Sequence, residues 1–181
     1  MPHENTLDAR RAALAVIDVQ EAFRQHIPDF TEVAARCALV AHAARLLGVP
    51  VIVTEQYPKG LGHTVEEVAQ ALGEDARPLE KVRFSATEAD GFDFGGRDQA
   101  VVCGVETHVC VNQTALDLLA AGTRVQVAID AVGSRTAENR ALGLERMERA
   151  GAAMTSVETA LFELLGGSDA DEFKTVQALV K

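Results

Sequence analysis

The sequence predicts an α/β fold in three layers, α/β/α, in which a mostly parallel six-stranded sheet carries helices on both faces. Three observations lead to this prediction. Short apolar runs alternate with segments whose apolar residues recur at helical spacing. Most of the helical segments end at a glycine, where helices commonly stop. The chain has 181 residues, 48% of them hydrophobic, which is enough for one buried core. We therefore treat residues 1–181 as a single domain.

Six segments are predicted as strands because each is a short apolar run, which is typical of a strand buried between two layers of helices. Five of these runs are clear, and one over 80–85 is weaker. The predicted strands cover residues 13–18, 50–54, 80–85, 99–104, 124–129 and 152–156.

Six further segments are predicted as helices from their apolar spacing and their end signals. The second opens on Thr64-Val65-Glu66-Glu67, a capping box in which Thr64 is the N-cap. Strands that alternate with helices in this way imply a mostly parallel sheet. The predicted helices cover 31–47, 64–72, 107–121, 136–150, 158–165 and roughly 170–180.

The composition disfavours several classes of partner. With 27 acidic and 17 basic residues, the chain has a net charge of −10, which argues against nucleic acids and anionic membranes. No apolar run approaches the ~20 residues that cross a bilayer, and the first residues lack the apolar stretch of a signal peptide. Three cysteines are an odd number, which does not suggest a disulfide framework. We therefore expect a cytoplasmic protein that acts on a small molecule.

Two charged residues are out of place at the predicted strands. Ligands bind to such sheets at the carboxyl ends of the strands. Asp18 directly follows the apolar run ALAVI, and Lys81 lies in the run over 80–85, where Val82 and Phe84 share the opposite face. Both residues also have an ordinary explanation, because an aspartate can cap a turn and a lysine on an edge strand can be solvated.

Cys110 is the candidate nucleophile because of the residues expected near it. It lies in the first turns of the predicted helix over 107–121, where the helix dipole favours a thiolate. Lys81 would lower the thiol pKa further, and Asp18 could take the thiol proton and pass it to a leaving group. Taken alone, Cys110 could equally be an inert buried cysteine. The combination predicts thiol-based acyl transfer, with the pKa of Cys110 below its usual value.

The other two cysteines are expected to be structural. Cys37 lies in the middle of a predicted helix, and Cys103 lies inside an apolar strand. Burial disfavours a thiolate, so both thiols should keep a pKa near or above ~8.5.

Four motifs follow one another along the chain: DVQEAF (18–23), KVRFSA (81–86), GVETHVCVNQTALDLLAAG (104–122) and the segment 130–158. In this order they resemble the isochorismatase-like cysteine hydrolases, and the resemblance extends from about residue 12 to the end of the chain. YPKGLGHT (57–64) and FKTVQALVK (173–181) are closer still to one subgroup, the isochorismatase-domain-containing proteins. The resemblance implies a hydrolase.

The resemblance also implies roles for individual residues. Cys110 matches the nucleophile, Asp18 the general base and acid, and Lys81 the cation that favours the thiolate. A cis peptide bond of the family maps onto Val105–Glu106, where the N–H of Glu106 would join that of Cys110 in an oxyanion hole. The expected reaction is hydrolysis of a small amide or related C–N bond through a thioester. The family forms dimers and larger assemblies, so we expect a homo-oligomer.

Five residues near these strand ends are candidate contacts to a substrate. Two aromatic residues would form walls of a pocket, and three polar residues would bind polar groups. For each of them, ordinary packing or surface exposure is an equally good explanation. The candidates are Gln20, Phe23, Gln56, Tyr57 and His108.

No metal and no cofactor is expected. Nicotinamidases of this family carry an Asp-x-His…His metal site after the second strand, but here that place contains TEQYPKG (54–60). The sequence around His108 also lacks the ligand spacing of a zinc site. Two alternatives stay open: a vinyl-ether hydrolase of the isochorismatase type that uses Asp18, and a non-catalytic interaction protein with a relic site.

Overall fold

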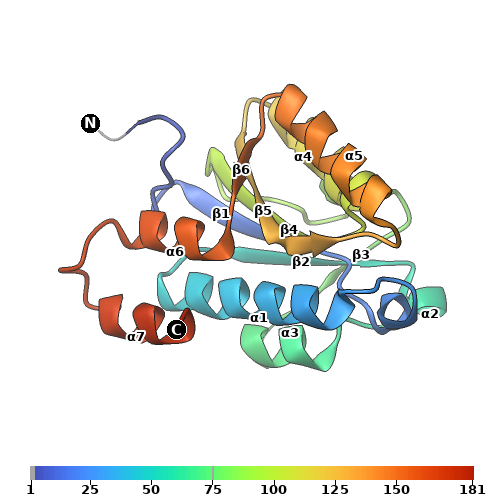
Figure 1. The fold of residues 1–181 in the computed structure, drawn as a ribbon, viewed down its shortest axis with the longest axis horizontal. Helices are drawn as coiled ribbons and strands as arrows, with labels where there is room; N and C mark the ends of the chain where they lie inside the picture. The colour runs from blue at the N-terminus through green and yellow to red at the C-terminus, as the bar shows by residue number, and fades with distance from the viewer. Residues whose placement is uncertain (1–2, 75) are drawn as a thin grey trace.

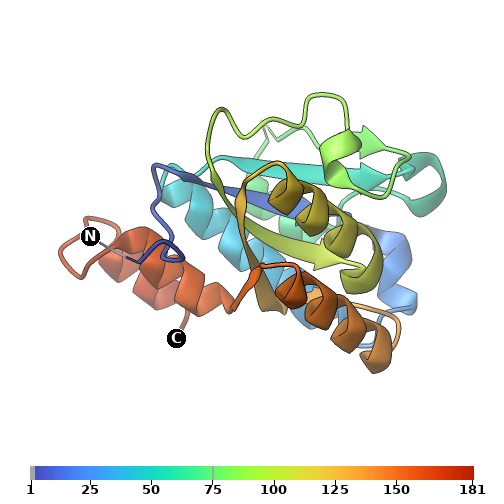
Figure 2. The same ribbon diagram turned by 90° about the horizontal axis from the view of Figure 1, so that it is seen from above.

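The computed structural model describes residues 3–74 and 76–181. Six parallel strands form one sheet in the order β3-β2-β1-β4-β5-β6. Helices α1 and α6 cover one face of the sheet, with α3 and α7 outside them, and α4 and α5 cover the other face (Figure 1). Viewed from above, α4 and α5 run side by side across that second face (Figure 2). The predicted three-layer fold with a parallel six-stranded sheet is confirmed.

All six strands lie where apolar runs predict them, but two differ in length. The third strand stops at Lys81, so the strand predicted over 80–85 does not continue past that residue, and Val82 and Phe84 are 73% and 50% exposed. The fifth strand continues to Gly133, past an irregularity in its pairing with the fourth. The strands are β1 (Ala12–Ile17), β2 (Val51–Gln56), β3 (Leu79–Lys81), β4 (Gln99–Val105), β5 (Arg124–Gly133) and β6 (Ala153–Thr155).

All six predicted helices are present, with two differences in detail, and the structure adds three short helices that the sequence does not predict. Thr64 does not cap α3; its N–H and its hydroxyl instead donate to the buried carboxylate of Glu55 at 2.6 and 2.8 Å. The helix expected over 107–121 begins with a π-helical turn, η3 (Thr107–Val111), before α4 (Asn112–Ala120). The other helices are η1 (Glu21–Gln25), α1 (Phe30–Leu46), α2 (Pro58–Leu61), α3 (Glu66–Leu72), η2 (Ala86–Glu88), α5 (Ala137–Arg149), α6 (Val157–Leu165) and α7 (Phe173–Leu179).

The core has two halves because successive side chains of a strand point to opposite faces of the sheet. From β1, Leu14 and Val16 pack towards α1, whereas Ala13 and Ile17 pack towards α4 and α5. All four are buried, which explains why the strand is apolar at every position. In the part of the chain that the structure describes, no helix is long and apolar enough to cross a membrane.

Two glycines allow the close packing that places the η3 turn. Gly104 in β4 has a φ of +114°, and a Cβ there would lie 2.1 Å from the carbonyl oxygen of Ile17. Gly143 in α5 faces η3, and a Cβ on it would lie 2.8 Å from the carbonyl group of Thr107. Any larger residue would push β4 from the end of β1, or α5 from the turn.

Candidate active site

Asp18 lies at the end of β1 as a fully buried carboxylate. Its backbone has a φ of +51°, a region that few residues other than glycine adopt. The Thr54 hydroxyl donates to one carboxylate oxygen at 2.7 Å, and the Lys81 ammonium donates to the other at 2.6 Å. Thr54 comes from the adjacent strand β2 and Lys81 from β3, the strand beyond it, so this aspartate is not a simple turn cap.

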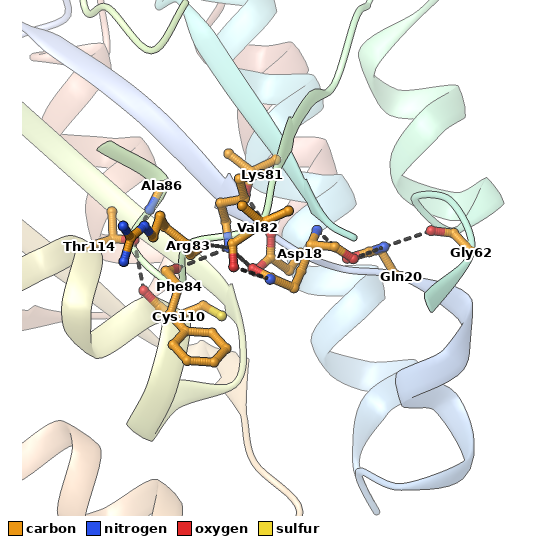
Figure 3. Close-up of polar contacts among 12 residues, drawn as sticks. Asp18, Gln20, Gly62, Lys81, Val82, Arg83, Phe84, Ala86, Cys110 and Thr114 are labelled. Carbon is orange, nitrogen blue, oxygen red and sulfur yellow. Dashed lines mark hydrogen bonds and ion pairs between the residues drawn. The ribbon is translucent and has the colours of Figure 1, made fainter. Parts of the chain in front are cut away.

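Lys81 is not a solvated edge residue, because none of its side chain is exposed. Besides Asp18, its ammonium donates to the side-chain oxygen of Gln56 at 2.7 Å and to the carbonyl of Phe84 at 3.0 Å, with the carbonyl of Arg83 at 3.3 Å (Figure 3). A buried ammonium is tolerated only when it is paired and hydrogen-bonded, and here every donor has an acceptor.

Cys110 lies in η3, directly after β4, and is 5% exposed. Its carbonyl accepts a hydrogen bond from the Thr114 hydroxyl at 2.7 Å, and that hydroxyl accepts one from the N–H of Ala86 at 2.8 Å. Thr114 therefore joins the cysteine turn to the segment that follows Lys81 (Figure 3).

The pKa of the Cys110 thiol is raised from 9.0 to about 12. Burial is the largest cause, the negative charge of Asp18 adds to it, and the positive charge of Lys81 acts in the opposite direction. The expected lowering of this pKa is therefore wrong for the resting protein, because burial and a like charge outweigh the lysine. Hydrogen bonding with Cys103, and after it burial, raises the pKa of the Cys37 thiol well above its usual value, as expected.

The Val105–Glu106 peptide bond is cis, and the Glu106 side chain is anchored beside it. Its buried carboxylate accepts hydrogen bonds from Nε and Nη2 of Arg135 at 3.0 and 3.1 Å. His108 Nε2 lies 3.6 Å from the same carboxylate, and its Nδ1 lies 3.1 Å from the Ser134 hydroxyl. The sequence did not single out Arg135, and the segment GSR after β5 gives no sign of this pairing.

The two glutamines proposed as substrate contacts both form hydrogen bonds with protein atoms. The fully buried Gln20 donates to the carbonyls of Gln56 and Gly62 at 3.0 and 2.6 Å. The Gln56 amide accepts from Lys81 and donates to the carbonyl of Val82 at 2.9 Å. Gln56 therefore contacts Lys81 directly, and Gln20 contacts Gln56.

The other three candidate contacts are distributed around the site. Phe23 packs partly buried against the core on the α1 side of the sheet, whereas Cys110 belongs to the opposite half. Tyr57 is 55% exposed, and its φ of 37° places it in the left-handed region. His108 is mostly buried against Glu106. Among these three, His108 is closest along the chain to Cys110.

The place after β2 that holds metal ligands in nicotinamidases holds a hydrogen-bonded loop here. Glu55 accepts from Thr64, and its second oxygen lies 3.0 Å from Nδ1 of His63. Within residues 3–74 and 76–181, no three His, Cys, Asp or Glu side chains are placed to hold a metal ion together.

The chain matches known proteins over most of its length. The family model described as the isochorismatase domain matches residues 12–159. The secreted isochorismatase effector Isc1 of Phytophthora sojae is 41% identical, and the match covers 94% of this chain and 84% of that protein. Isochorismatase domain-containing protein 2 of Bos taurus is also 41% identical, over 93% of this chain and 82% of its own.

Solved structures agree with these relatives. One described as MAR1 ribonuclease from Caenorhabditis elegans has a TM-score of 0.92 and 41% identity, covering 96% of this chain and 91% of its own. YcaC of Escherichia coli, described as an octameric hydrolase of unknown specificity, has a TM-score of 0.85 and 25% identity, covering 99% and 92%. From the family model, the relatives and the shared fold, we conclude that the chain belongs to the isochorismatase family of hydrolases, as its motifs predict.

Proposed function

We propose that the protein is a cysteine-dependent hydrolase of a small amide or a related C–N bond. One observation carries the proposal: the charges of a fully buried Asp18–Lys81 ion pair both act on the thiol of Cys110. Nucleophile, proton acceptor and cation are the groups that acyl transfer through a thioester requires. They come from the ends of β1, β3 and β4, where ligands bind in parallel sheets.

In the first half of the reaction, the sulfur of Cys110 attacks the carbonyl carbon of the substrate. With a pKa of about 12, the thiol is protonated at rest, so its proton moves to Asp18 as the S–C bond forms. Lys81 stabilises the negative charge on sulfur, and the N–H groups of Glu106 and Cys110 are our proposed donors to the oxyanion. The C–N bond then breaks, and the Asp18 carboxylic acid protonates the leaving amine.

In the second half, water hydrolyses the thioester. The water oxygen attacks the acyl carbon, and Asp18, again a carboxylate, takes a proton from that water. The C–S bond breaks, the carboxylic acid leaves, and the proton held by Asp18 returns to the Cys110 sulfur. Asp18 thus acts as base and acid in both halves, and no outside oxidant or reductant is needed.

A panel of small amides, ureides and carbamates, with Cys110→Ala as the blank, tests this proposal. We expect turnover of at least one class, complete loss in Cys110→Ala, and loss in step with iodoacetamide labelling of Cys110. Turnover of isochorismate that survives alkylation would instead favour the vinyl-ether reaction. An unreactive thiol and no turnover would favour a relic site.

RNA belongs in the same panel, because the C. elegans protein of the same fold is described as a ribonuclease. The net charge of −10 disfavours a polyanionic substrate, so we expect no cleavage. RNA cleavage that depends on Cys110 would overturn the proposal of a small-molecule substrate.

We also propose a homo-oligomer in a reducing, cytoplasmic setting. The octamer described for YcaC supports the assembly. Three buried free cysteines support the setting, although one relative is described as secreted. Light scattering on the purified protein tests the assembly, and a mass equal to one chain would contradict it.

A further inference from the structure

The side-chain amide of Gln56 contacts the Lys81 ammonium almost as closely as the carboxylate of Asp18 does. Gln56, the last residue of β2, places its side-chain oxygen 2.7 Å from the Lys81 ammonium, compared with 2.6 Å for Asp18. The amide nitrogen of Gln56 donates to the carbonyl of Val82 at 2.9 Å. One side chain therefore holds both the ammonium and the turn that follows the lysine.

Gln56 is itself held by Gln20. The Gln20 side-chain oxygen accepts the N–H of Gln56 at 2.7 Å, and its nitrogen donates to the Gln56 carbonyl at 3.0 Å and to that of Gly62 at 2.6 Å. The last paired residues of β1 and β2 are Ile17 and Thr54. Beyond this pair, the side chain of Gln20 supplies the hydrogen bonds to the backbone of Gln56. The side chain of Gln20 is fully buried and shielded from water, whereas Gln56 is partly buried.

The remaining acceptors of the ammonium are less well anchored. The carbonyls of Arg83 and Phe84 belong to a turn whose side chains point into solvent, with Val82 73% and Phe84 50% exposed. That turn depends on Gln56 through the hydrogen bond to Val82. Without the Gln56 amide, Lys81 would keep Asp18 as its one side-chain acceptor and two carbonyls of a poorly packed turn.

We propose that Gln56 is a positioning residue that fixes the Lys81 ammonium beside the Cys110 thiol, and that Gln20 acts by fixing Gln56. The proposal rests on the proposed function, in which Cys110 is the nucleophile and Lys81 its cation. Burial of the thiol and the negative charge of Asp18 disfavour the Cys110 thiolate, whereas the positive charge of Lys81 favours it. Because Coulomb attraction falls with distance, a displaced ammonium stabilises less thiolate.

The rate of Cys110 alkylation by iodoacetamide, followed by peptide mass mapping from neutral to alkaline pH, tests the proposal without any substrate. We expect Gln56→Leu to slow alkylation at neutral pH at least ~5-fold and to move the whole pH profile to higher pH. A merely structural glutamine predicts the opposite, because loosened packing would expose the thiol and speed its alkylation. An unchanged or faster rate in Gln56→Leu would therefore overturn the proposal.

A second variant covers the case in which Gln56→Leu does not fold. Gln56→Asn keeps the amide but withdraws its oxygen by one methylene group, so it should slow alkylation in the same direction. Gln25→Asn is the matched control, because Gln25 is exposed in η1, and it should react at the wild-type rate. A Gln56→Asn rate equal to that of the control would equally overturn the proposal.

The Lys81→Met background separates action through Lys81 from every other effect. If Gln56 acts through the ammonium, Gln56→Asn should cause no further slowing once the ammonium is gone. Equal slowing in both backgrounds would show that Gln56 acts otherwise. These outcomes do not depend on the amide panel, so the positioning role can stand or fall separately from the proposed reaction.

Discussion

The two ends of the sheet bury different kinds of polar group. At the amino ends of the strands, Gln99 accepts the N–H of Asp8 at 2.8 Å and donates to the carbonyl of Thr6 at 2.9 Å. Gln126 lies beside it and donates to Glu163 at 3.0 Å. These side chains attach the N-terminal segment to the sheet, and the groups nearest the strands are neutral amides.

At the carboxyl ends, the buried groups are charged. Asp18, Lys81 and Glu106 are each at most 4% exposed, and Cys110 lies among them. Neutral amides would satisfy the same backbone at far lower desolvation cost, since an ion loses several kcal/mol of hydration on burial. Hydrogen bonding alone explains the buried amides at the amino ends of the strands. The buried charges at the carboxyl ends are explained if they take part in a reaction.

The contrast between the two ends of the sheet would fail most clearly if turnover did not need Asp18. Asp18→Asn should reduce turnover at least ~100-fold, because the proton acceptor and donor of both half-reactions is lost. The same change should make Cys110 easier to alkylate at neutral pH, because the Asp18 charge raises the thiol pKa. Turnover and thiol reactivity therefore move in opposite directions. Loss of folding would also expose the thiol, so the melting temperature of the variant must match that of the wild type for the result to count. Near-normal turnover in a folded variant would remove the assignment.

A substitution at the amino ends of the strands should change the stability of the protein but not the reactivity of Cys110. Gln99→Leu leaves the Asp8 N–H and the Thr6 carbonyl without their partner, which should lower the free energy of unfolding by about 1–3 kcal/mol. For a chain of this size each kcal/mol corresponds to roughly 2–4 °C in the melting temperature. Cys110 alkylation should stay at the wild-type rate. Slower alkylation with an unchanged melting temperature would mean that the two ends are coupled.

The sequence predicts the convergence of Asp18, Lys81 and Cys110 because the carboxyl ends of parallel strands meet at one edge. It does not predict the electrostatic balance there. The dipole and the lysine that favour the thiolate follow from position in the sequence, whereas the desolvation that opposes it depends on packing from both sides. That packing includes the approach of α5 at Gly143, which no local pattern reveals.

Partners distant in sequence are likewise hidden. Arg135 looks like any exposed arginine until Glu106 is known to be buried within its reach. Thr64 has the pattern of a helix cap, but the carboxylate of Glu55, in β2, accepts two hydrogen bonds from it. Local pattern therefore predicts the elements and strand ends, and tertiary contacts decide which acceptor each polar group finds.

The raised pKa of Cys110 predicts a pH-dependent loss of stability. Between the ordinary value of 9.0 and about 12, the unfolded chain releases the thiol proton while the folded protein keeps it. Fewer protons on the unfolded state mean that stability falls as pH rises through this window. The difference in unfolding free energy between wild type and Cys110→Ser should be constant below pH ~8 and shift against wild type by about 1 kcal/mol near pH ~10. A constant difference, measured by urea unfolding, would place this thiol in a more polar site.

Removal of metal should have the smallest effect, namely none on turnover or thiol reactivity. The candidate ligands at the end of β2 and in the loop after it are Glu55 and His63, but both Glu55 oxygens already accept from Thr64 or face His63. A metal there would have to displace these bonds with one carboxylate and one imidazole, fewer than the ligands of a typical catalytic zinc site. After exhaustive dialysis against a chelator, turnover and the Cys110 alkylation rate should equal those of the untreated protein. Activity lost on chelation and restored by zinc would show that the loop after β2 binds a metal, and the charged end of the sheet would then need a cation besides Lys81 to explain its chemistry.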